Sequence, residues 1–588
     1  MPKIITCIAE KPSVAKDIAK VLGCKDVKDG YYEGFSVLLE AFTRVTWTFG
    51  HLCQLKLPHE YRPDWKAWNF KQLPLIPDRF QITLKHNDGV RKQFGIIKEL
   101  FNSSDEIINC GDAGQEGELI QRWVLQQTGA KCPVKRLWIS SMTDEAIKEG
   151  FSHLVDQSKY QHLYEAGLAR ACGDWLIGMT ASRYYTLTGG MRGQTFSVGR
   201  VQTPTLAMIV KRQEEIDNFV PEDYYVLSTI YKDTTFQATK GSYKDKDEAK
   251  DDLDAIKGKP FKVTGVTTKK ANEAPPRLYD LTSLQVDMNK KYGYSAESTL
   301  ETLQSLYEAK LVTYPRVDTT YLPEDVYGDC SRILRGLPGY SDYVSKLNLN
   351  KLRKDKKYFD SSKVTDHHAI IPTGKTPYGV LTDAQINLYD DIVKHFIAIF
   401  YPDCVKSVTS ITGKVDKVEF KTSGNQILDL GWYEVFGRSP EGKMLPAFEK
   451  GEEGPHKPTL TTRTTTPPPL YTEATLLRAM ETAGNEVEDE ELRAAMKANG
   501  IGRPSTRAAI IELLFKRGYI AHQKKNIVPT SIGVTLIDAI TDPLLKSPEL
   551  TGQWEKKLRD VEAGKYPVGQ FIDELKDMTY KIVNKKRV

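Results

Sequence analysis

The chain of 588 residues lacks several features that mark common functional classes. Its eight cysteines are scattered and form no CxxC pair, which argues against a zinc ribbon and against a secreted disulfide framework. No apolar stretch is long enough to span a bilayer, and the apolar run near the amino terminus is too short for a signal peptide. These absences predict a soluble protein of a reducing compartment.

Two further absences concern nucleotides and charge. The sequence has no GxxxxGKS or GxxxxGKT loop, so it offers no P-loop for ATP. Its net charge of +5 is small for this length, so any binding of nucleic acid depends on where individual lysines and arginines lie. The length exceeds what a single hydrophobic core supports and predicts about three to five domains.

The stretch LVTYPRVDTT, residues 311–320, carries a combination of reactive side chains. Its β-branched residues favour a strand, and Pro315 biases the preceding residue towards an extended backbone. In an extended segment Tyr314, Arg316 and Asp318 project from one face. A guanidinium binds phosphate and favours the ionised form of a nearby phenol, so this face could attack a phosphodiester. The alternative is a plain strand whose tyrosine packs and whose arginine pairs with the aspartate.

Acidic residues follow two expected strands. Residues 4–9 form an apolar run of strand length that ends at Glu10, and residues 107–110 form another before GDAGQEGE. Ligands of α/β sheets sit at the carboxyl ends of strands. If both strands belong to one sheet, Glu10, Asp112 and Glu116 can converge on a hard cation. The alternative is a glycine turn whose acidic residues favour the start of a helix.

Residues 160–218 have a helical pattern with two polar pairs. Arg170 and Asp174 are an i, i+4 pair, which usually only supports a helix surface. In FSVGRVQTPTL the glycine permits close approach of the backbone, so Arg200 and Gln202 can meet a phosphate or a base. A structural turn explains the same residues.

Beyond Pro221 the pattern becomes β-like, and a second β-like region covers residues 405–470. Between them lies a helical insertion, residues 281–400, in which a helix at 296–309 leads into LVTYPR. We therefore expect the separated β regions to form one body that carries the tyrosine on a helical lobe. The charged residues 244–257 indicate a solvated helix or loop.

Paired histidines occur in VTDHHAIIPT, on a polar turn before an apolar run. Adjacent histidines point apart, so His367 and His368 are a poor metal pair. A histidine that contacts phosphate or relays a proton competes equally with an exposed polar loop.

The segment GIGRPSTRAAIIELL predicts the start of a helix that Ser505 or Thr506 can cap. Backbone amides at that start, together with Arg503 and Arg507, would form a seat for phosphate.

Together these motifs resemble the type IA DNA topoisomerases, and most closely the bacterial topoisomerase III group. The motifs that carry the resemblance occur in the family's order along most of the chain: IAEKPSVAKDIA, GDAGQEGE, ARACGDWLIGMTASR, SVGRVQTPTL, LVTYPRVDT, DHHAIIPT, PPPLYTEATLLRAME and GIGRPSTRAAIIELLFKRGY.

The resemblance implies a multi-domain torus that combines α/β, α and β domains. A TOPRIM domain of Rossmann-like type would come first, and a β-rich arch would carry the helical lobe with the tyrosine. The expected domains are residues 1–151 (TOPRIM), 152–218 with 467–588 (helical, DNA-binding), 219–274 with 397–466 (β-rich arch) and 275–396 (tyrosine lobe).

The resemblance also implies a mechanism. Tyr314 would attack a phosphodiester of one DNA strand, giving a 5′-phosphotyrosine and a free 3′-hydroxyl. Arg316 and Lys11 would stabilise the charge on the phosphate. Glu10 would protonate the leaving oxygen and act as the base in religation. His367 matches the family's phosphate-site histidine.

Cofactors and partners follow from the same resemblance. Mg²⁺ would be held by Glu10, Asp112 and Glu116, with no need of ATP or zinc. The partner would be single-stranded or negatively supercoiled DNA, with a helicase or single-strand-binding protein as a further partner. We expect a monomer without membrane contact, in the cytoplasm at the nucleoid, that relaxes negative supercoils, decatenates DNA, or does both. The residues that match the family's strand-binding groove are Arg170, Asp174, Arg200, Gln202, Thr506 and Arg507.

The sequence departs from the family's pattern in two places. Gly114 stands where the acidic motif usually has a second aspartate, and Gln115 stands where it usually has an arginine. One carboxylate fewer predicts weaker or differently arranged Mg²⁺ binding. The carboxyl-terminal part also lacks the cysteine modules that bind zinc in many relatives, so DNA handling by accessory ribbons is not expected.

Three other functions compete with this one. A tyrosine recombinase or type IB topoisomerase also forms a phosphotyrosine, but without metal and at the 3′ end. A TOPRIM nuclease or primase leaves YPR without a purpose. A non-enzymatic single-strand-binding protein predicts that Tyr314→Phe changes nothing measurable.

Overall fold

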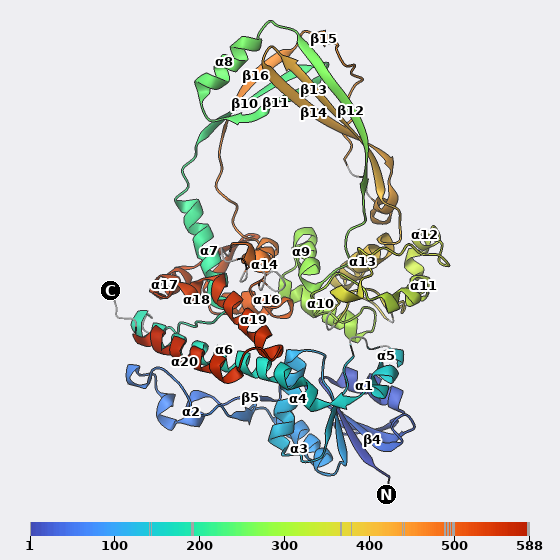
Figure 1. Cartoon of the computed structure of the whole chain (residues 1–588), viewed down its shortest axis with the longest axis vertical. Helices are drawn as coiled ribbons and strands as arrows, with labels where there is room; N and C mark the ends of the chain where they lie inside the picture. Colours follow the sequence, from blue (N-terminus) through green and yellow to red (C-terminus); the bar gives the residue numbers. More distant parts are fainter. Residues whose placement is uncertain are drawn as a thin grey trace.

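The computed structural model describes most of the chain, arranged as a ring (Figure 1). In that view an α/β body lies at the bottom, helical bodies lie above it on both sides, and a β-sheet closes the top. The described residues are 2–139, 142, 144–189, 193–364, 367–377, 379–437, 439, 441–486, 490, 493, 496 and 500–584.

The amino-terminal body is built on a seven-stranded sheet in the order β2-β3-β4-β1-β7-β8-β9. Its central strand β1 pairs in parallel with β4 on one side and with β7 on the other. Because β1 is covered on both faces, its sequence IITCIA is a continuous apolar run rather than an alternating one. The strands are β1 (Ile4–Ala9), β2 (Asp26–Lys28), β3 (Tyr31–Ser36), β4 (Ala41–Trp47), β7 (Glu106–Cys110), β8 (Val134–Arg136) and β9 (Val155–Asp156).

The helices of this body follow the strands as the sequence predicts, since α1 comes directly after β1 and α4 directly after β7. A small hairpin and a short helix extend from the body under the helical body. These elements are α1 (Pro12–Leu22), α2 (Pro58–Tyr61), α3 (Asp88–Asn102), α4 (Gln115–Thr128), α5 (Asp144–Ser152), β5 (Cys53–Leu55) and β6 (Ile82–Leu84).

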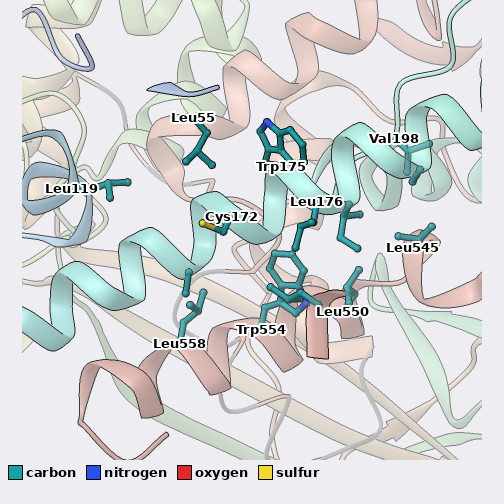
Figure 2. Close-up of a cluster of buried hydrophobic side chains, with 14 of the residues drawn as sticks. Leu55, Leu119, Cys172, Trp175, Leu176, Val198, Leu545, Leu550, Trp554 and Leu558 are labelled. Carbon is teal, nitrogen blue, oxygen red and sulfur yellow. The ribbon is translucent and has the colours of Figure 1, made fainter. Parts of the chain in front are cut away.

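The helical body is organised around α6 (Gln161–Gly189), a helix of 29 residues that buries side chains on most of its faces. In Figure 2, Cys172, Trp175 and Leu176 of this helix lie in one apolar cluster with Trp554 and Leu558 of α19. The other elements of this body come from both ends of the domain's sequence. They are α7 (Gln202–Asp217), α14 (Glu473–Thr482), α16 (Pro504–Lys516), α17 (Ser531–Ala539), α18 (Pro543–Lys546), α19 (Pro548–Glu562), α20 (Val568–Asn584), β17 (Ile520–Gln523) and β18 (Asn526–Pro529).

The sheet at the top of Figure 1 joins the two separated β regions, as the sequence predicts. It has seven strands in the order β15-β12-β13-β14-β11-β10-β16. We call it the arch sheet. Its strands are β10 (Asp223–Tyr231), β11 (Thr234–Tyr243), β12 (Phe261–Glu273), β13 (Cys404–Val415), β14 (Val418–Asp429), β15 (Glu453–Gly454) and β16 (Lys457–Thr464).

The charged residues 244–257 form a helix on the arch sheet, α8 (Lys246–Ile256). Asp245 caps its start by accepting bonds from two backbone amides. Ala249 and Ile256 are buried against the sheet, whereas most of the charged side chains are exposed. The helix therefore has the solvated character that its composition predicts.

The tyrosine lobe is the helical insertion between β12 and β13. Its helix α10 delivers the chain into LVTYPR, which confirms the helix expected at 296–309. The helices are α9 (Leu281–Tyr292), α10 (Ala296–Glu308), α11 (Tyr327–Arg335), α12 (Ser341–Val344) and α13 (Asp383–Ala398).

The strand predicted for residues 311–320 is wrong. The segment makes one isolated bridge, between Val312 and Pro372, and no ladder. Both the segment and its bridging partner contain a proline, and Pro315 and Pro372 have no amide hydrogen to donate to a ladder. The burial of successive residues nevertheless alternates: Pro315 and Val317 are buried, while Arg316 is exposed. The segment thus keeps the two-faced character of a strand without its pairing.

Among the described residues, no helix is both long enough and apolar enough to cross a membrane.

Candidate active site

The carboxyl ends of β1 and β7 place Glu10 and Asp112 next to each other, because the two strands are parallel neighbours. The loop after β7 is held by Arg136, whose guanidinium is fully buried and donates to the carbonyl oxygens of Gly111 and Asp112 at 2.6 and 2.8 Å. Gly117 allows the loop to turn back on α4, since a Cβ there would lie 2.3 Å from the Asp112 carbonyl oxygen. The local fold thus fixes the position of Asp112.

Tyr314 meets this acidic edge although it belongs to the tyrosine lobe. Lys11 Nζ donates a hydrogen bond of 3.0 Å to Tyr314 Oη and lies 3.9 Å from Asp112 Oδ2. The ring of His367 lies against the tyrosine ring, with 4.1 Å between centroids, and the ring of Tyr307 stands edge-on at 5.6 Å. The phenol is therefore held between the two bodies, with Lys11 as its hydrogen-bond donor.

A cavity of about 170 Å³ opens on one side of Tyr314. We call it the carboxylate cavity. Tyr314, Arg316 and Asp318 all line it, so the one-sided projection predicted for LVTYPRVDTT is observed without a strand. Its other lining residues include Glu10, Asp112, Gly114, Glu116, His367, Arg503 and Ser505.

Burial changes the protonation of the groups around this cavity. Burial, together with the nearby carboxylate of Asp112, raises the pKa of Glu10 to about 7. Burial lowers the pKa of His367 to about 4, so its ring is neutral near pH 7. Glu10 can therefore carry a proton close to neutral pH, which an ordinary glutamate does not.

Opposing forces act on the tyrosine and its lysine. Burial and the charge of Asp112 raise the pKa of Tyr314, and the ammonium of Lys11 offsets part of that rise. Burial lowers the pKa of Lys11, but Tyr314, Asp112 and Glu10 outweigh it, and the net shift is upward. Lys11 is thus a permanent cation beside the phenol.

The expected metal ligands line one cavity but do not form a ready cluster. Glu116 Oε1 lies 2.5 Å from His51 Nε2, and this contact lowers the pKa of Glu116. Among the described residues, no three His, Cys, Asp or Glu side chains lie close enough together to hold a metal ion. Glu10 Oε2, however, is buried without a hydrogen-bond partner. An unsatisfied carboxylate oxygen beside a second carboxylate is a donor set that suits Mg²⁺.

Arg170 and Arg200 meet at Glu555 of α19. Arg170 binds Glu555 through two hydrogen bonds of 2.6 and 2.9 Å, and Arg200 adds one of 3.4 Å. Asp174 accepts from Arg200 at 3.1 Å. Burial raises the pKa of Glu555, but the two guanidiniums outweigh it and bring it down to about 2. The pair that the sequence indicated, Arg170 with Asp174, is not made; each arginine bridges helices instead.

Gln115 connects this network to the acidic edge. Its Oε1 accepts from Arg170 at 3.2 Å and from Arg503 at 2.9 Å, and its Nε2 donates to Glu562 at 2.8 Å. An arginine at this position would face two other arginines. The exchange of arginine for glutamine therefore has a structural explanation in this chain.

Arg200, Gln202 and Asp174 line a second cavity, of about 620 Å³, in the helical body. We call it the groove cavity. Gln202 Oε1 is buried there without a hydrogen-bond partner. Three further lining residues, Trp68, Arg183 and Arg517, were not predicted from the sequence. Arg183 lies 5.2 Å from the centre of the Trp68 ring.

The start of α16 differs from its prediction. Neither Ser505 nor Thr506 caps the helix; Arg503 occupies the N-cap position, makes no side-chain cap and is followed by Pro504. Thr506 is exposed and donates to the Arg503 carbonyl oxygen at 3.0 Å. Proline at the first helical position supplies the favourable backbone angle and needs no amide partner, so a capping side chain is dispensable.

Arg507 is buried in the interface between the helical body and the tyrosine lobe. Its Nη1 donates to Thr282 Oγ1 at 2.9 Å, and its Nε donates to the Gly502 carbonyl oxygen at 3.1 Å. The structure does not bring this arginine to the groove cavity.

His51 and Glu555 were also not predicted, although they hold Glu116 and the two arginines. Glu555 lies 355 positions after Arg200 in sequence. No local pattern marks either residue, and only their contacts in the fold reveal them.

Two family models match the chain. One, described as DNA topoisomerase, matches residues 158–573, and the other, described as Toprim domain, matches residues 5–142. This chain belongs to the DNA topoisomerase family, in its type IA branch. The topoisomerase is accordingly an isomerase that acts on DNA, and its first sheet is a Toprim domain.

Relatives of this topoisomerase match nearly the whole chain. The DNA topoisomerase 3 of Bacillus cereus is 39% identical over 601 residues, which cover 98% of this chain and 81% of the relative. The DNA topoisomerase 3 of Shouchella clausii is 38% identical, with 98% and 80% covered. That of Bacillus subtilis is 36% identical, with 98% and 81% covered.

A solved structure shares the fold. Full-length topoisomerase I from Thermotoga maritima superimposes with a TM-score of 0.72 at 23% identity, covering 99% of this chain and 91% of that one. The torus expected from the sequence motifs is confirmed by this match.

Proposed function

We propose that the topoisomerase breaks one DNA strand with Tyr314 and holds the broken end as a 5′-phosphotyrosine. The observation that carries this proposal is the contact between Lys11 Nζ and Tyr314 Oη at 3.0 Å. It joins a nucleophile from the tyrosine lobe to the acidic edge of the Toprim sheet. Tyr314, which attacks, and Glu10, which protonates the leaving oxygen, both line the carboxylate cavity.

The chemistry follows from the groups in that cavity. Tyr314 loses its phenolic proton to solvent, Tyr314 Oη attacks phosphorus, and the bond from phosphorus to the 3′ oxygen breaks. Lys11 and Arg316 stabilise the negative charge on the phosphate. Glu10, with its pKa near 7, donates a proton to the 3′ oxygen and takes it back when the strand is resealed. Because the phosphotyrosine retains the energy of the broken bond, resealing needs no ATP.

Mg²⁺ is the metal that the carboxylate cavity suits. Asp112 and Glu116 would hold it, after Glu116 leaves His51, and Glu10 would join them as a ligand once it has given up its proton. The ion would supply positive charge beside the phosphate. His367, neutral and packed on the tyrosine ring, keeps one N–H that can donate a hydrogen bond to a phosphate oxygen. We assign no zinc to this chain.

The groove cavity is the proposed path of the single strand. Its arginines can meet the DNA backbone, and Trp68 offers a face on which a base can stack. Gln202 Oε1 lacks a donor there, and Thr506 is exposed beside the start of α16. We retain the four expected domains as part of this proposal, and a monomer in the cytoplasm, with a helicase or single-strand-binding protein as partner.

Trapping the covalent complex tests the proposal. An oligonucleotide labelled at its 3′ end should transfer label to the wild-type protein, whereas one labelled at its 5′ end should release a free labelled product. Tyr314→Phe should abolish both cleavage and relaxation and retain strand binding. Tyr307→Phe is the matched control, because its ring lies 5.6 Å from Tyr314 and should not be needed as a nucleophile.

The opposite label pattern would contradict the proposal, since attachment at the 3′ end characterises tyrosine recombinases and type IB enzymes. Cleavage that survives in Tyr314→Phe would instead indicate a Toprim nuclease. If Tyr314→Phe behaves like the wild type in the relaxation assay, the remaining alternative is a protein that binds single strands without cleaving them.

A further inference from the structure

A second cavity adjoins Tyr314, on the side away from Glu10. It has a volume of about 310 Å³ and lies between helix α1 and the tyrosine lobe. We call it the α1 cavity. It shares Asp112, Tyr314 and His367 with the carboxylate cavity, so these three side chains separate the two spaces. The proposed mechanism leaves this space without a role.

The geometry of the cleavage step indicates which half of the broken strand lies at which cavity. In an in-line displacement the leaving oxygen departs on the side opposite the nucleophile. The leaving 3′ oxygen must reach Glu10, and Glu10 lines the carboxylate cavity but not the α1 cavity. The strand on the 5′ side of the break therefore lies towards the carboxylate cavity. The nucleotide that stays on Tyr314 needs a different space next to the same ring.

The lining of the α1 cavity suits a nucleotide. Tyr307 presents an aromatic ring, and Thr313, Thr373 and Lys375 contribute hydroxyl groups and a cation. Carboxylates also line the cavity: Asp17, Asp112, Asp144 and Glu308. Asp17 is paired with Lys310 at 2.9 Å and Asp144 with Lys20 at 2.7 Å, so we assign the phosphate contact to Lys375. A ring, hydroxyls and cations are what a base, a sugar and a phosphate require. Its volume is at the low end of the roughly 300–1,000 Å³ range of ligand pockets.

The end of helix α10 forms part of the rim of this cavity. Lys310 has φ of 60°, in the left-handed region that a lysine seldom adopts. Its ammonium reaches across to Asp17 of α1 at 2.9 Å. Thr373 Oγ1 donates to the Lys310 carbonyl oxygen at 2.6 Å and secures this backbone. The Lys310 amide donates to the Tyr307 carbonyl oxygen at 2.8 Å, and the Leu311 amide donates to the Leu306 carbonyl oxygen at 2.9 Å. A left-handed residue with these two bonds is a common way to end a helix, so the end of α10 fixes the position of the rim.

We propose that the α1 cavity binds the nucleotide immediately 3′ of the broken bond, the one that stays attached to Tyr314. This inference rests on the proposed function, because it presupposes a 5′-phosphotyrosine at this residue. The walls of the cavity belong to different bodies: Ser13, Asp17 and Lys20 come from α1, whereas Tyr307, Thr373 and Lys375 come from the tyrosine lobe. When the bodies separate, the lobe wall keeps the nucleotide and the α1 wall releases it.

Strand binding by Lys375→Ala tests the proposal. In a Tyr314→Phe background, which prevents cleavage, two oligonucleotides are compared after the cleavage site has been mapped with the wild type. One continues past the site, and the other ends at the nucleotide 5′ of the scissile phosphate. Lys375→Ala should lower the affinity for the longer oligonucleotide about fivefold, as expected for one lost phosphate contact. The affinity for the shorter oligonucleotide should not change.

Lys356→Ala is the matched control, since Lys356 is an exposed lysine of the same lobe that lines neither cavity. It removes the same charge and should change neither affinity. Equal weakening of both oligonucleotides by Lys375→Ala, or an equal effect of Lys356→Ala, would overturn the proposal.

Photocrosslinking gives a second, independent measurement on the wild-type chain. A 5-iodouracil placed immediately 3′ of the cleavage site should crosslink to the peptide that contains Tyr307. Crosslinks confined to the peptide of Trp68 in the groove cavity would contradict the assignment. If the wild type forms no 5′-phosphotyrosine, the proposed function fails; if it does and these assays show no effect, the α1 cavity assignment alone fails.

Discussion

At the scale of single residues, Lys11 matters more to the tyrosine than the neighbouring arginine does. Burial and two carboxylates oppose ionisation of Tyr314, and Lys11 is the group that lowers its pKa. Its ammonium lies 3.0 Å from the phenol oxygen and 4.7 Å from the ring centre. The reactivity of the proposed nucleophile therefore depends on a residue that is 303 positions away in sequence.

Replacement of that lysine should slow cleavage and shift its pH dependence. Lys11→Ala removes the cation that favours the phenolate, so we expect single-turnover cleavage to fall about a hundredfold or more. The remaining activity should rise at higher pH than in the wild type, because the pKa of Tyr314 is then higher. Lys11→Arg keeps the positive charge, so its rate of cleavage should lie between the rates of the wild type and Lys11→Ala. An unchanged pH profile in Lys11→Ala would show that the lysine does not act on the phenol.

Gly114 offers a test of the metal site. Its φ of 163° is extended backbone that any residue adopts, so Gly114→Asp should fold. The new carboxylate borders the carboxylate cavity and should lower the Mg²⁺ concentration that gives half-maximal relaxation. Gly114→Asn is the uncharged control of the same size. If Gly114→Asp leaves the Mg²⁺ dependence of relaxation unchanged, the missing carboxylate has no bearing on metal binding.

At the scale of elements, helix α19 holds the site together from a distance. Glu555 supplies the anion for Arg170 and Arg200, which come from α6 and from the turn before α7. Gln115 at the start of α4 joins the same network through Arg170. The position of α4, and with it Glu116, thus depends on an ion pair far along the chain.

Removal of Glu555 should destabilise this junction. Glu555→Ala removes the anion that Arg170 binds through two hydrogen bonds and leaves the buried Arg200 with Asp174 alone. Breaking a buried ion pair costs about 3–5 kcal/mol. We expect faster amide hydrogen exchange in α6 and α19, measured by mass spectrometry because unfolding of several domains is not two-state. Glu562→Ala is the control on the same helix, since this exposed residue loses one hydrogen bond to Gln115. Equal exchange in the two variants would contradict the role given to Glu555.

The same network predicts a direction for the effect of pH. The folded pKa of Glu555, about 2, lies below its ordinary value of 4.5. A depressed carboxylate stabilises the fold above pH 4.5 and loses that contribution as the pH falls towards 2. The protection of α19 against exchange should therefore decline over this interval in the wild type. Glu555→Gln should show little of that decline.

The sequence predicted individual elements better than the contacts between them. The apolar run at β1 and the glycine loop before α4 are local patterns. The condition set for their acidic residues to converge, that both strands belong to one sheet, is met. The strand predicted for residues 311–320 does not form, because a strand needs a partner segment whose backbone amides can donate hydrogen bonds. Glu555 and His51 could not be found at all, since their partners are set by the packing of whole helices.

At the scale of the whole molecule, the tyrosine lobe has three attachments. One is its interface with the helical body, where Arg507 donates to Thr282 and the Ala296 amide donates to Glu473. The ends of the lobe run into β12 and β13 near one edge of the arch sheet, whereas the helical body runs into β10 and β16 at the other edge. It also touches the Toprim domain through Lys310 with Asp17, and through Lys11 with Tyr314. We call these two contacts the gate. The arch sheet keeps the ring connected when the gate opens.

Weakening the gate should favour its open form. Lys310 and Asp17 are 48% and 29% exposed at their side chains, so their ion pair contributes about 0.2–1 kcal/mol. Asp17→Ala should raise the ratio of open to closed molecules by at most about fivefold, measured by single-molecule energy transfer between the Toprim domain and the lobe. The double charge reversal Asp17→Lys with Lys310→Asp should restore the wild-type ratio. A ratio that rises equally in the single and the double variant would exclude this ion pair as a gate contact.

The contact between Lys11 and Tyr314 has one more consequence, which concerns the order of events. The lysine belongs to the Toprim domain and the tyrosine to the lobe, so under the proposed mechanism Lys11 activates Tyr314 only in the closed ring. A molecule that stands open cannot cut an intact strand. The enzyme therefore carries a built-in interlock: the break is made while both sides of the strand are held, and an accidental nick by an open molecule is prevented by the separation of the two residues.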